Sequence, residues 1–136
     1  MSFGASVSDM QVALADDCTT IALREVDVAI PGIARQEQID CRGFDYFGAP
    51  RLAEFVFGDG RLMIAWILVE TPELDALEAA FTAQYGAPTH KTPMLAAYAD
   101  DQAVVRRDTP EAGFYAPALD APYRGFFDAQ VAAASE

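Results

Sequence analysis

The sequence is poor in positive charge. It contains 9 Lys and Arg residues against 21 Asp and Glu residues, which gives a formal net charge of −12. Phosphate backbones and anionic membrane surfaces repel such a chain, so we expect neither nucleic acid nor a membrane as a partner. The same acidic excess favours a soluble protein.

Cysteine and histidine are scarce as well. Cys18, Cys41 and His90 are the only residues of these two types, and they are a poor ligand set for zinc or iron, so we expect no metal. Gly58-Asp59-Gly60 precedes a strand rather than a helix, so it is no phosphate-binding loop, and we expect no cofactor. The two cysteines are either buried thiols or a bridge closing a loop of about 24 residues, worth about 3 kcal/mol.

Long apolar runs are missing too. No stretch approaches the ~20 apolar residues that a membrane-spanning helix requires. The first residues lack the basic start and long apolar run that are typical of a secretory signal. We therefore expect a cytoplasmic protein as the chain is numbered, or a periplasmic one if a signal peptide has been removed.

Apolar residues are plentiful, at 52% of the 136 residues. A chain of this length is the size of one domain and buries about two-thirds of its unfolded surface on folding. We predict a single domain over residues 1–136, with frayed ends at residues 1–5 and 134–136.

The strongest local signal is a β-hairpin over residues 52–70. Two apolar, β-rich runs flank Gly58-Asp59-Gly60, where glycine supplies the positive φ angles of a tight turn. Further strands are predicted by β-branched or alternating apolar residues at 18–30, 36–47, 94–99, 102–107 and 113–117.

Three segments have helical patterns. In residues 72–85, Pro72 suits the first helical turn, and Gly86 with Pro88 ends the helix. The other two are an N-terminal helix ending near Asp17 and a C-terminal helix over residues 122–134. His90 falls in a predicted loop at residues 88–93.

Short links between the strands require antiparallel neighbours. The sequence therefore predicts an α+β fold, an antiparallel β-sheet meander packed by two to three helices. A helix followed by strands occurs twice, which suggests a duplicated α-β-β-β unit.

Residues 51–116 include a helix that ends in Tyr85-Gly86-Ala87-Pro88 and a short meander after it. This pattern resembles the αβ units of small bacterial envelope proteins of the BLIP-like and SmpA/BamE-like group. The resemblance implies a bacterial protein with a binding surface on its sheet and no catalysis.

Enzyme chemistry has little support in the sequence. His90 could act as a general base, paired with a thiol of Cys41 or Cys18, but nothing in the spacing brings these groups together. An exposed loop histidine explains His90 better, so catalysis is the least favoured function and no catalytic residue is assigned.

Aromatic and arginine residues gather in the first predicted sheet and form a candidate ligand or partner patch. Its members are Phe44, Tyr46, Trp66, Arg42, Arg51 and Arg61. An exposed aromatic patch is typical of a protein contact or a ligand groove. We therefore expect a non-catalytic binding module whose partner is another protein or a second copy of the chain. A small-molecule-binding domain with an aromatic pocket is the alternative.

Overall fold

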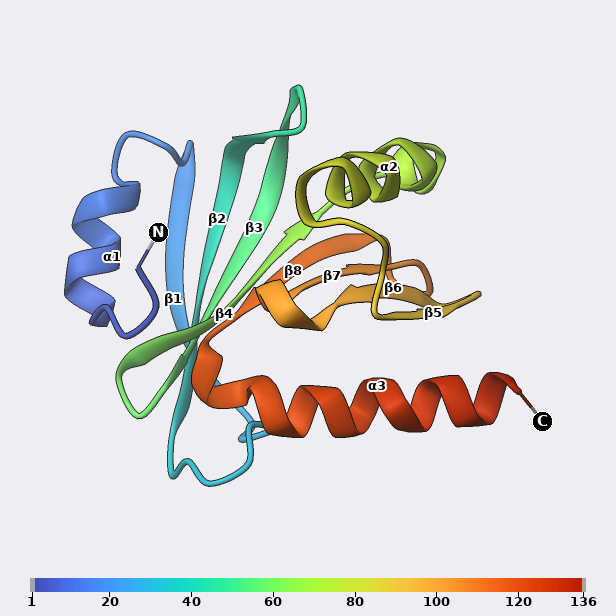
Figure 1. The fold of residues 1–136 in the computed structure, drawn as a ribbon. Coiled ribbons are helices and arrows are strands. Elements are labelled where there is room, and N and C mark those ends of the chain that lie inside the picture. The colour runs from blue at the N-terminus through green and yellow to red at the C-terminus, as the bar shows by residue number, and fades with distance from the viewer. Residues whose placement is uncertain (1, 136) are drawn as a thin grey trace. The chain divides into compact units, whose positions relative to one another are not determined.

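The computed structural model describes residues 2–135, and the chain divides into two compact units, Met1–Ile67 and Leu68–Glu136. Each unit contains a helix followed by a meander of four strands in which successive strands pair antiparallel (Figure 1). The predicted antiparallel α+β class is thereby confirmed. A single domain over the whole chain and a duplicated unit stay predictions.

The N-terminal unit is one helix and four strands. They are α1 (Val7–Leu14), β1 (Thr20–Val26), β2 (Gln36–Tyr46), β3 (Ala49–Gly58) and β4 (Arg61–Leu68). Each strand pairs with the next one along the chain, so β1 and β2 lie beside each other, as do β2 and β3, and β3 and β4.

The hairpin between β3 and β4 turns at Asp59 and Gly60, whose φ angles are 48° and 80°. Glycine adopts this left-handed region without strain, and aspartate tolerates it better than most residues. The Asp59 carboxylate also accepts hydrogen bonds from the backbone N–H groups of Ala34 and Arg35, at 3.0 and 2.9 Å. The hairpin predicted from the glycine-rich turn is confirmed.

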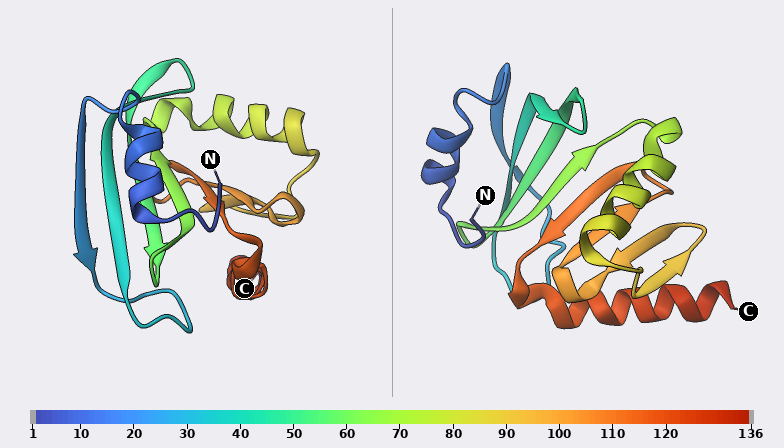
Figure 2. Two further views of the ribbon diagram at one scale, coloured as in Figure 1. Left: turned by 90° about the vertical axis from the view of Figure 1, so that its left-hand side faces the viewer. Right: turned by 45° about the horizontal axis from the view of Figure 1, so that its top comes forward.

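One face of this meander is apolar and buried. Ile39 pairs with Phe55, and Cys41 pairs with Ala53, so strand alternation places the four side chains on the same face. All four are at most 2% exposed. Helix α1 lies over this face, and β1 runs along the margin of the meander, as the left panel of Figure 2 shows.

Cys18 and Cys41 form a disulfide, with their Cα atoms 5.3 Å apart. Cys18 follows α1 closely, and Cys41 is fully buried in the middle of β2. Of the two alternatives that the sequence left open, the structure has the bridge. The segment that leaves α1 is thus covalently attached to the centre of the sheet.

The C-terminal unit has two long helices around four short strands. Its elements are η1 (Thr71–Glu73), α2 (Leu74–Tyr85), β5 (His90–Thr92), β6 (Leu95–Tyr98), η2 (Ala99–Asp101), β7 (Ala103–Arg106), β8 (Glu111–Tyr115), η3 (Pro117–Leu119) and α3 (Asp120–Ala134). The predicted helix over 72–85 is confirmed, with a 3-10 turn at its start and Gly86 in a positive φ of 89° at its end.

Helices α2 and α3 cover opposite faces of the second meander (Figure 1). Phe81 of α2 lies 5.7 Å from the ring of Phe114, whereas Phe127 of α3 lies 6.4 Å from the ring of Tyr115. Phe114 and Tyr115 are neighbours in β8, so their side chains point to opposite faces. Aromatic contacts therefore form the core on both sides of these strands.

Some predicted boundaries are wrong. The loop assigned to His90 is instead strand β5, which pairs with β6 and extends the meander by one strand. The first helix ends at Leu14 rather than near Asp17. At the N-terminus, where fraying was expected, Gly4 N–H donates to Leu62 O at 2.9 Å, and Leu62 N–H donates to Ala5 O at 2.8 Å. Residues 1 and 136 lie outside the described residues.

Among the described residues, no helix combines the length and the apolar character needed to cross a membrane.

The disulfide predicts a loss of stability on reduction. We expect a Cys18→Ala and Cys41→Ala double variant to have a free energy of unfolding about 3 kcal/mol lower than that of the oxidised protein, because opening the loop frees the unfolded chain. Urea unfolding curves measure this difference. The wild type in dithiothreitol is the matched control with an unchanged sequence, and equal midpoints for the oxidised and reduced proteins would contradict the prediction.

Candidate functional site

The candidate site lies beneath α1 in the N-terminal unit. Ser6 caps this helix, since its hydroxyl accepts a hydrogen bond from Asp9 N–H at 3.1 Å. Met10 and Leu14 are one helical turn apart, and both are buried against the sheet. The helix therefore presents one apolar edge to the sheet, and its other side chains, Val12 among them, are exposed or half-buried.

A cleft of about 480 Å³ opens between α1 and the sheet. Its apolar lining comes from both elements: Ala5, Met10, Ala13, Leu14, Phe44, Phe55 and Ile67. The rings of Phe44 and Phe55 meet edge to face, with centroids 5.9 Å apart. Ser2, Asp9 and Asp17 complete the lining and supply its polar groups. We call this hollow the α1 cleft.

A second hollow of about 520 Å³ adjoins the α1 cleft, because Asp17 and Phe44 line both. Asp16 and Asp45 also line it, which brings four carboxylates to the two hollows together with Asp9. Among the described residues that line them, none is Lys, Arg or His. The two hollows thus combine an aromatic wall with negative charge.

The positions of Asp16 and Asp17 are electrostatically unfavourable. They directly follow the C-terminal end of α1, which carries the negative end of the helix dipole. The last turn of α1 contains no basic residue. The sequence marked Asp17 only as the approximate end of a helix; the repulsion between two adjacent carboxylates and the helix dipole is the signal that points to a site.

A β-bulge brings Phe44 into the cleft. The register of β2 against β3 shifts between Arg42 and Phe44, so Phe44 faces Arg51 and lies on the buried side with α1. Gly43, between them, has a φ of 80°. A Cβ atom there would lie 2.7 Å from Thr19 Cγ2, so both conformation and space require glycine.

The structure divides the patch predicted from the sequence. Three of its members lie on the α1 face of the meander. Phe44 and Tyr46 follow the bulge in β2, and Arg51 pairs with Phe44. Arg42 and Trp66 lie on the opposite face by strand alternation. These five residues therefore form no single surface.

The three arginines of that patch also differ in environment. Arg42 is exposed, but Arg51 is only 8% exposed, and its guanidinium donates to Tyr46 O at 3.0 Å. The side chain of Arg61 donates to Gly4 O at 3.2 Å. Arg51 is therefore not exposed to a partner; it holds the turn between β2 and β3.

The face opposite α1 carries a polar network. Arg24 Nε donates to Asp40 Oδ2 at 2.8 Å, and Gln38 Nε2 donates to Asp40 Oδ1 at 2.7 Å and to Glu54 Oε2 at 3.2 Å. Partial burial tends to raise the pKa of Asp40, but the hydrogen bonds from Gln38 and Arg24 outweigh it and hold the pKa below its ordinary value. Burial, followed by repulsion from Asp40, raises the pKa of Glu54.

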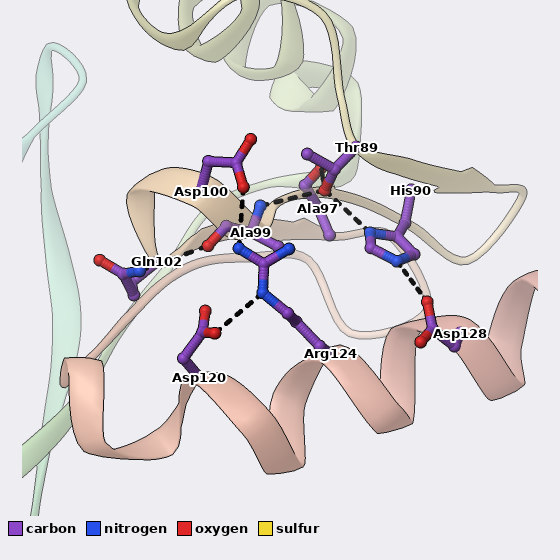
Figure 3. Close-up of polar contacts among 9 residues, drawn as sticks. All are labelled: Thr89, His90, Ala97, Ala99, Asp100, Gln102, Asp120, Arg124 and Asp128. Atoms are coloured by element: carbon purple, nitrogen blue, oxygen red, sulfur yellow. Dashed lines mark hydrogen bonds and ion pairs between the residues drawn. The ribbon is translucent and has the colours of Figure 1, made fainter.

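His90 belongs to a second group of polar contacts, in the C-terminal unit (Figure 3). Its Nε2 lies 2.7 Å from Asp128 Oδ1 of α3, and its Nδ1 lies 2.8 Å from Thr89 Oγ1. Nearby, Arg124 of α3 bonds both Asp120 and Asp100, each at 2.8 Å. Side chains of α3 thus attach it to β5 and to the turn after β6.

A carboxylate, an imidazole and a hydroxyl are hydrogen-bonded in a row here, from Asp128 through His90 to Thr89, as in the triad of acyl-transfer enzymes. However, the Thr89 hydroxyl also accepts from Ala99 N–H at 3.1 Å and lies 3.1 Å from the carbonyl of Ala97. These bonds hold it as a link between two strand ends. Cys41 has no free thiol to act as a nucleophile, because it is bonded to Cys18 in the disulfide.

Within the described part of the chain, no three His, Cys, Asp or Glu residues form a group that could hold a metal ion. The chain matches no protein-family model, no curated protein and no solved structure. The α1 cleft is therefore interpreted from its own residues.

The raised pKa of Glu54 predicts how stability changes with pH. A raised pKa means that the folded state binds the proton more tightly, so the wild type loses stability as the pH rises through that pKa. Glu54→Gln removes this loss while keeping an acceptor for Gln38. We expect its melting temperature, relative to that of the wild type, to be higher at pH 7 than at pH 3.5.

Circular dichroism melts at several pH values measure this difference. Glu25→Gln, on the exposed strand β1 of the same meander, controls for the loss of one negative charge. A Glu54→Gln effect that is equal at both pH values would show that the environment of Glu54 is not what the structure indicates.

Proposed function

We propose that the protein is a non-catalytic binding module whose α1 cleft holds a small amphiphilic cation, with the apolar part of the ligand inside and its amine at the acidic rim. One observation carries this proposal: an aromatic cleft of about 480 Å³ is bordered by carboxylates, and none of its described lining residues is basic.

The apolar wall accounts for the apolar part of the ligand. Clefts of 300–1,000 Å³ with mostly apolar linings are typical of small-molecule sites. Phe44 and Phe55 offer ring surface, and Met10 offers an adaptable side chain. Burying apolar ligand surface against these groups supplies the main favourable free energy.

The acidic rim determines the sign of the ligand's charge. Asp9 and Asp17 border the cleft, and Asp16 and Asp45 border the adjoining hollow. Within the described residues, none of these four carboxylates forms an ion pair of its own. A cationic ligand relieves their mutual repulsion and can also contact the face of Phe44. An anionic ligand is repelled.

A charge series of probes with the same phenylbutyl carbon skeleton tests this proposal. We expect 4-phenylbutylamine to bind with a Kd on the order of 1 mM, as its size allows. We expect the uncharged 4-phenyl-1-butanol to bind about 5-fold more weakly, since it lacks the charge interaction. The anion 4-phenylbutyrate should show no saturable binding. Backbone amide shifts in two-dimensional NMR titrations measure all three.

Two pairs of variants locate the binding. Ala13→Phe fills the cleft and should abolish amine binding, whereas Val12→Phe, which points outward and is 79% exposed, should preserve it. Asp17→Asn should weaken amine binding but not alcohol binding, and Asp27→Asn, outside both hollows, should change neither. Equal affinity for all three probes, or amine binding that survives Ala13→Phe, would refute the proposal.

A further inference from the structure

Strand β1 has one free edge. It pairs with β2 over all seven of its residues, and it stands at one end of the strand order, so no described residue pairs with its outer side. The left panel of Figure 2 shows β1 at the margin of the N-terminal meander, away from α1. Its outward backbone N–H and C=O groups are therefore available to another strand.

The side chains of β1 are unusual for a free edge. Ile21 and Leu23 are 42% and 43% exposed, and both lie on the α1 face, since they pair with Cys41 and Ile39. Free edges are commonly protected by proline, lysine or a bulge, and β1 contains none of these. Residues 20–23 carry no charge at all.

The two charges of β1 are already bonded within the chain. Arg24 donates to Asp40 at 2.8 Å, and Glu25 lies 3.3 Å from the guanidinium of Arg35. These pairs reduce the repulsion that charged side chains would exert on an incoming strand. The edge is thus apolar in its first half and electrically balanced in its second half.

We propose that β1 pairs with β1 of a second copy of this chain, antiparallel and about a two-fold axis at Ala22. In this register Ile21 faces Leu23 of the other copy and Leu23 faces Ile21, so that four apolar side chains meet on one face. Arg24 faces the uncharged Thr20 of the other copy. The strand is therefore complementary to itself.

Neighbouring two-fold registers are less favourable. An axis at Leu23 places Ile21 opposite the Glu25 carboxylate, and an axis at Arg24 places two guanidinium groups opposite each other, which is destabilising. The axis at Ala22 places apolar side chains opposite each other and keeps the two Arg24 guanidinium groups apart. Of the axes at Ala22, Leu23 and Arg24, the axis at Ala22 is therefore the most favourable, which makes the proposal specific.

The first test is the oligomeric state. A single pair of strands buries little surface, so we expect a weak dimer with a Kd on the order of 100 μM by sedimentation equilibrium. Each copy carries a net charge of −12, and screening by salt should therefore tighten the dimer. Leu23→Lys should be monomeric, and Val12→Lys, an equally drastic change on α1, should dimerise like the wild type.

The second test depends on the register rather than on affinity. Ala22 lies opposite its own copy at the axis, so Ala22→Cys brings two Cα atoms to about 5 Å, within reach of a disulfide. Thr20→Cys, on the same strand and face, places its two Cα atoms about 14 Å apart. Under mild oxidation we expect a covalent dimer from Ala22→Cys alone, identified by non-reducing peptide mapping.

A wild type that stays monomeric at millimolar concentration in high salt would overturn the proposal. Equal crosslinking of the two cysteine variants would also overturn it, because it would show collision without a fixed register. A dimer that persists in Leu23→Lys would place the interface elsewhere on the chain.

Discussion

The disulfide between Cys18 and Cys41 is the constraint on which the N-terminal unit depends. It attaches the segment just after α1, a helix of 8 residues, to the fully buried centre of β2. Helices this short are marginal without tertiary contacts, and α1 buries only Met10 and Leu14. The covalent link holds this small apolar edge over the sheet, and the space left beside it is the α1 cleft.

The bulge at Gly43 is the second requirement for that cleft. Without the extra residue, Phe44 would point to the same face as Arg42, away from α1. Simple alternation along the sequence assigns it to that face, which explains why the patch predicted from the sequence is divided in the structure. The reason for Gly43 is three-dimensional: Thr19, just before the neighbouring strand β1, occupies the place of a Cβ atom.

Local signals predicted the local parts of this fold well. Gly58-Asp59-Gly60 marked the hairpin, and Pro72 with Gly86 marked the limits of the long helix, because turn and capping residues act within a few positions. Strand β5 was missed because three residues contain too little pattern. The burial of Arg51 and the bonds of His90 depend on partners distant in the sequence, and no spacing rule brings them together.

The distribution of charge connects the two proposed sites. In the C-terminal unit, Lys91, Arg106, Arg107 and Arg124 each bond one or two carboxylates, so the bases of that unit are engaged with acids of the same unit. In the N-terminal unit the bases Arg24 and Arg35 bond acids on or near β1 instead. Among the described residues, the four carboxylates around α1 form no ion pair, while the two charged side chains of β1 are each paired. A cation is therefore favoured at the cleft, and an apolar strand at the edge.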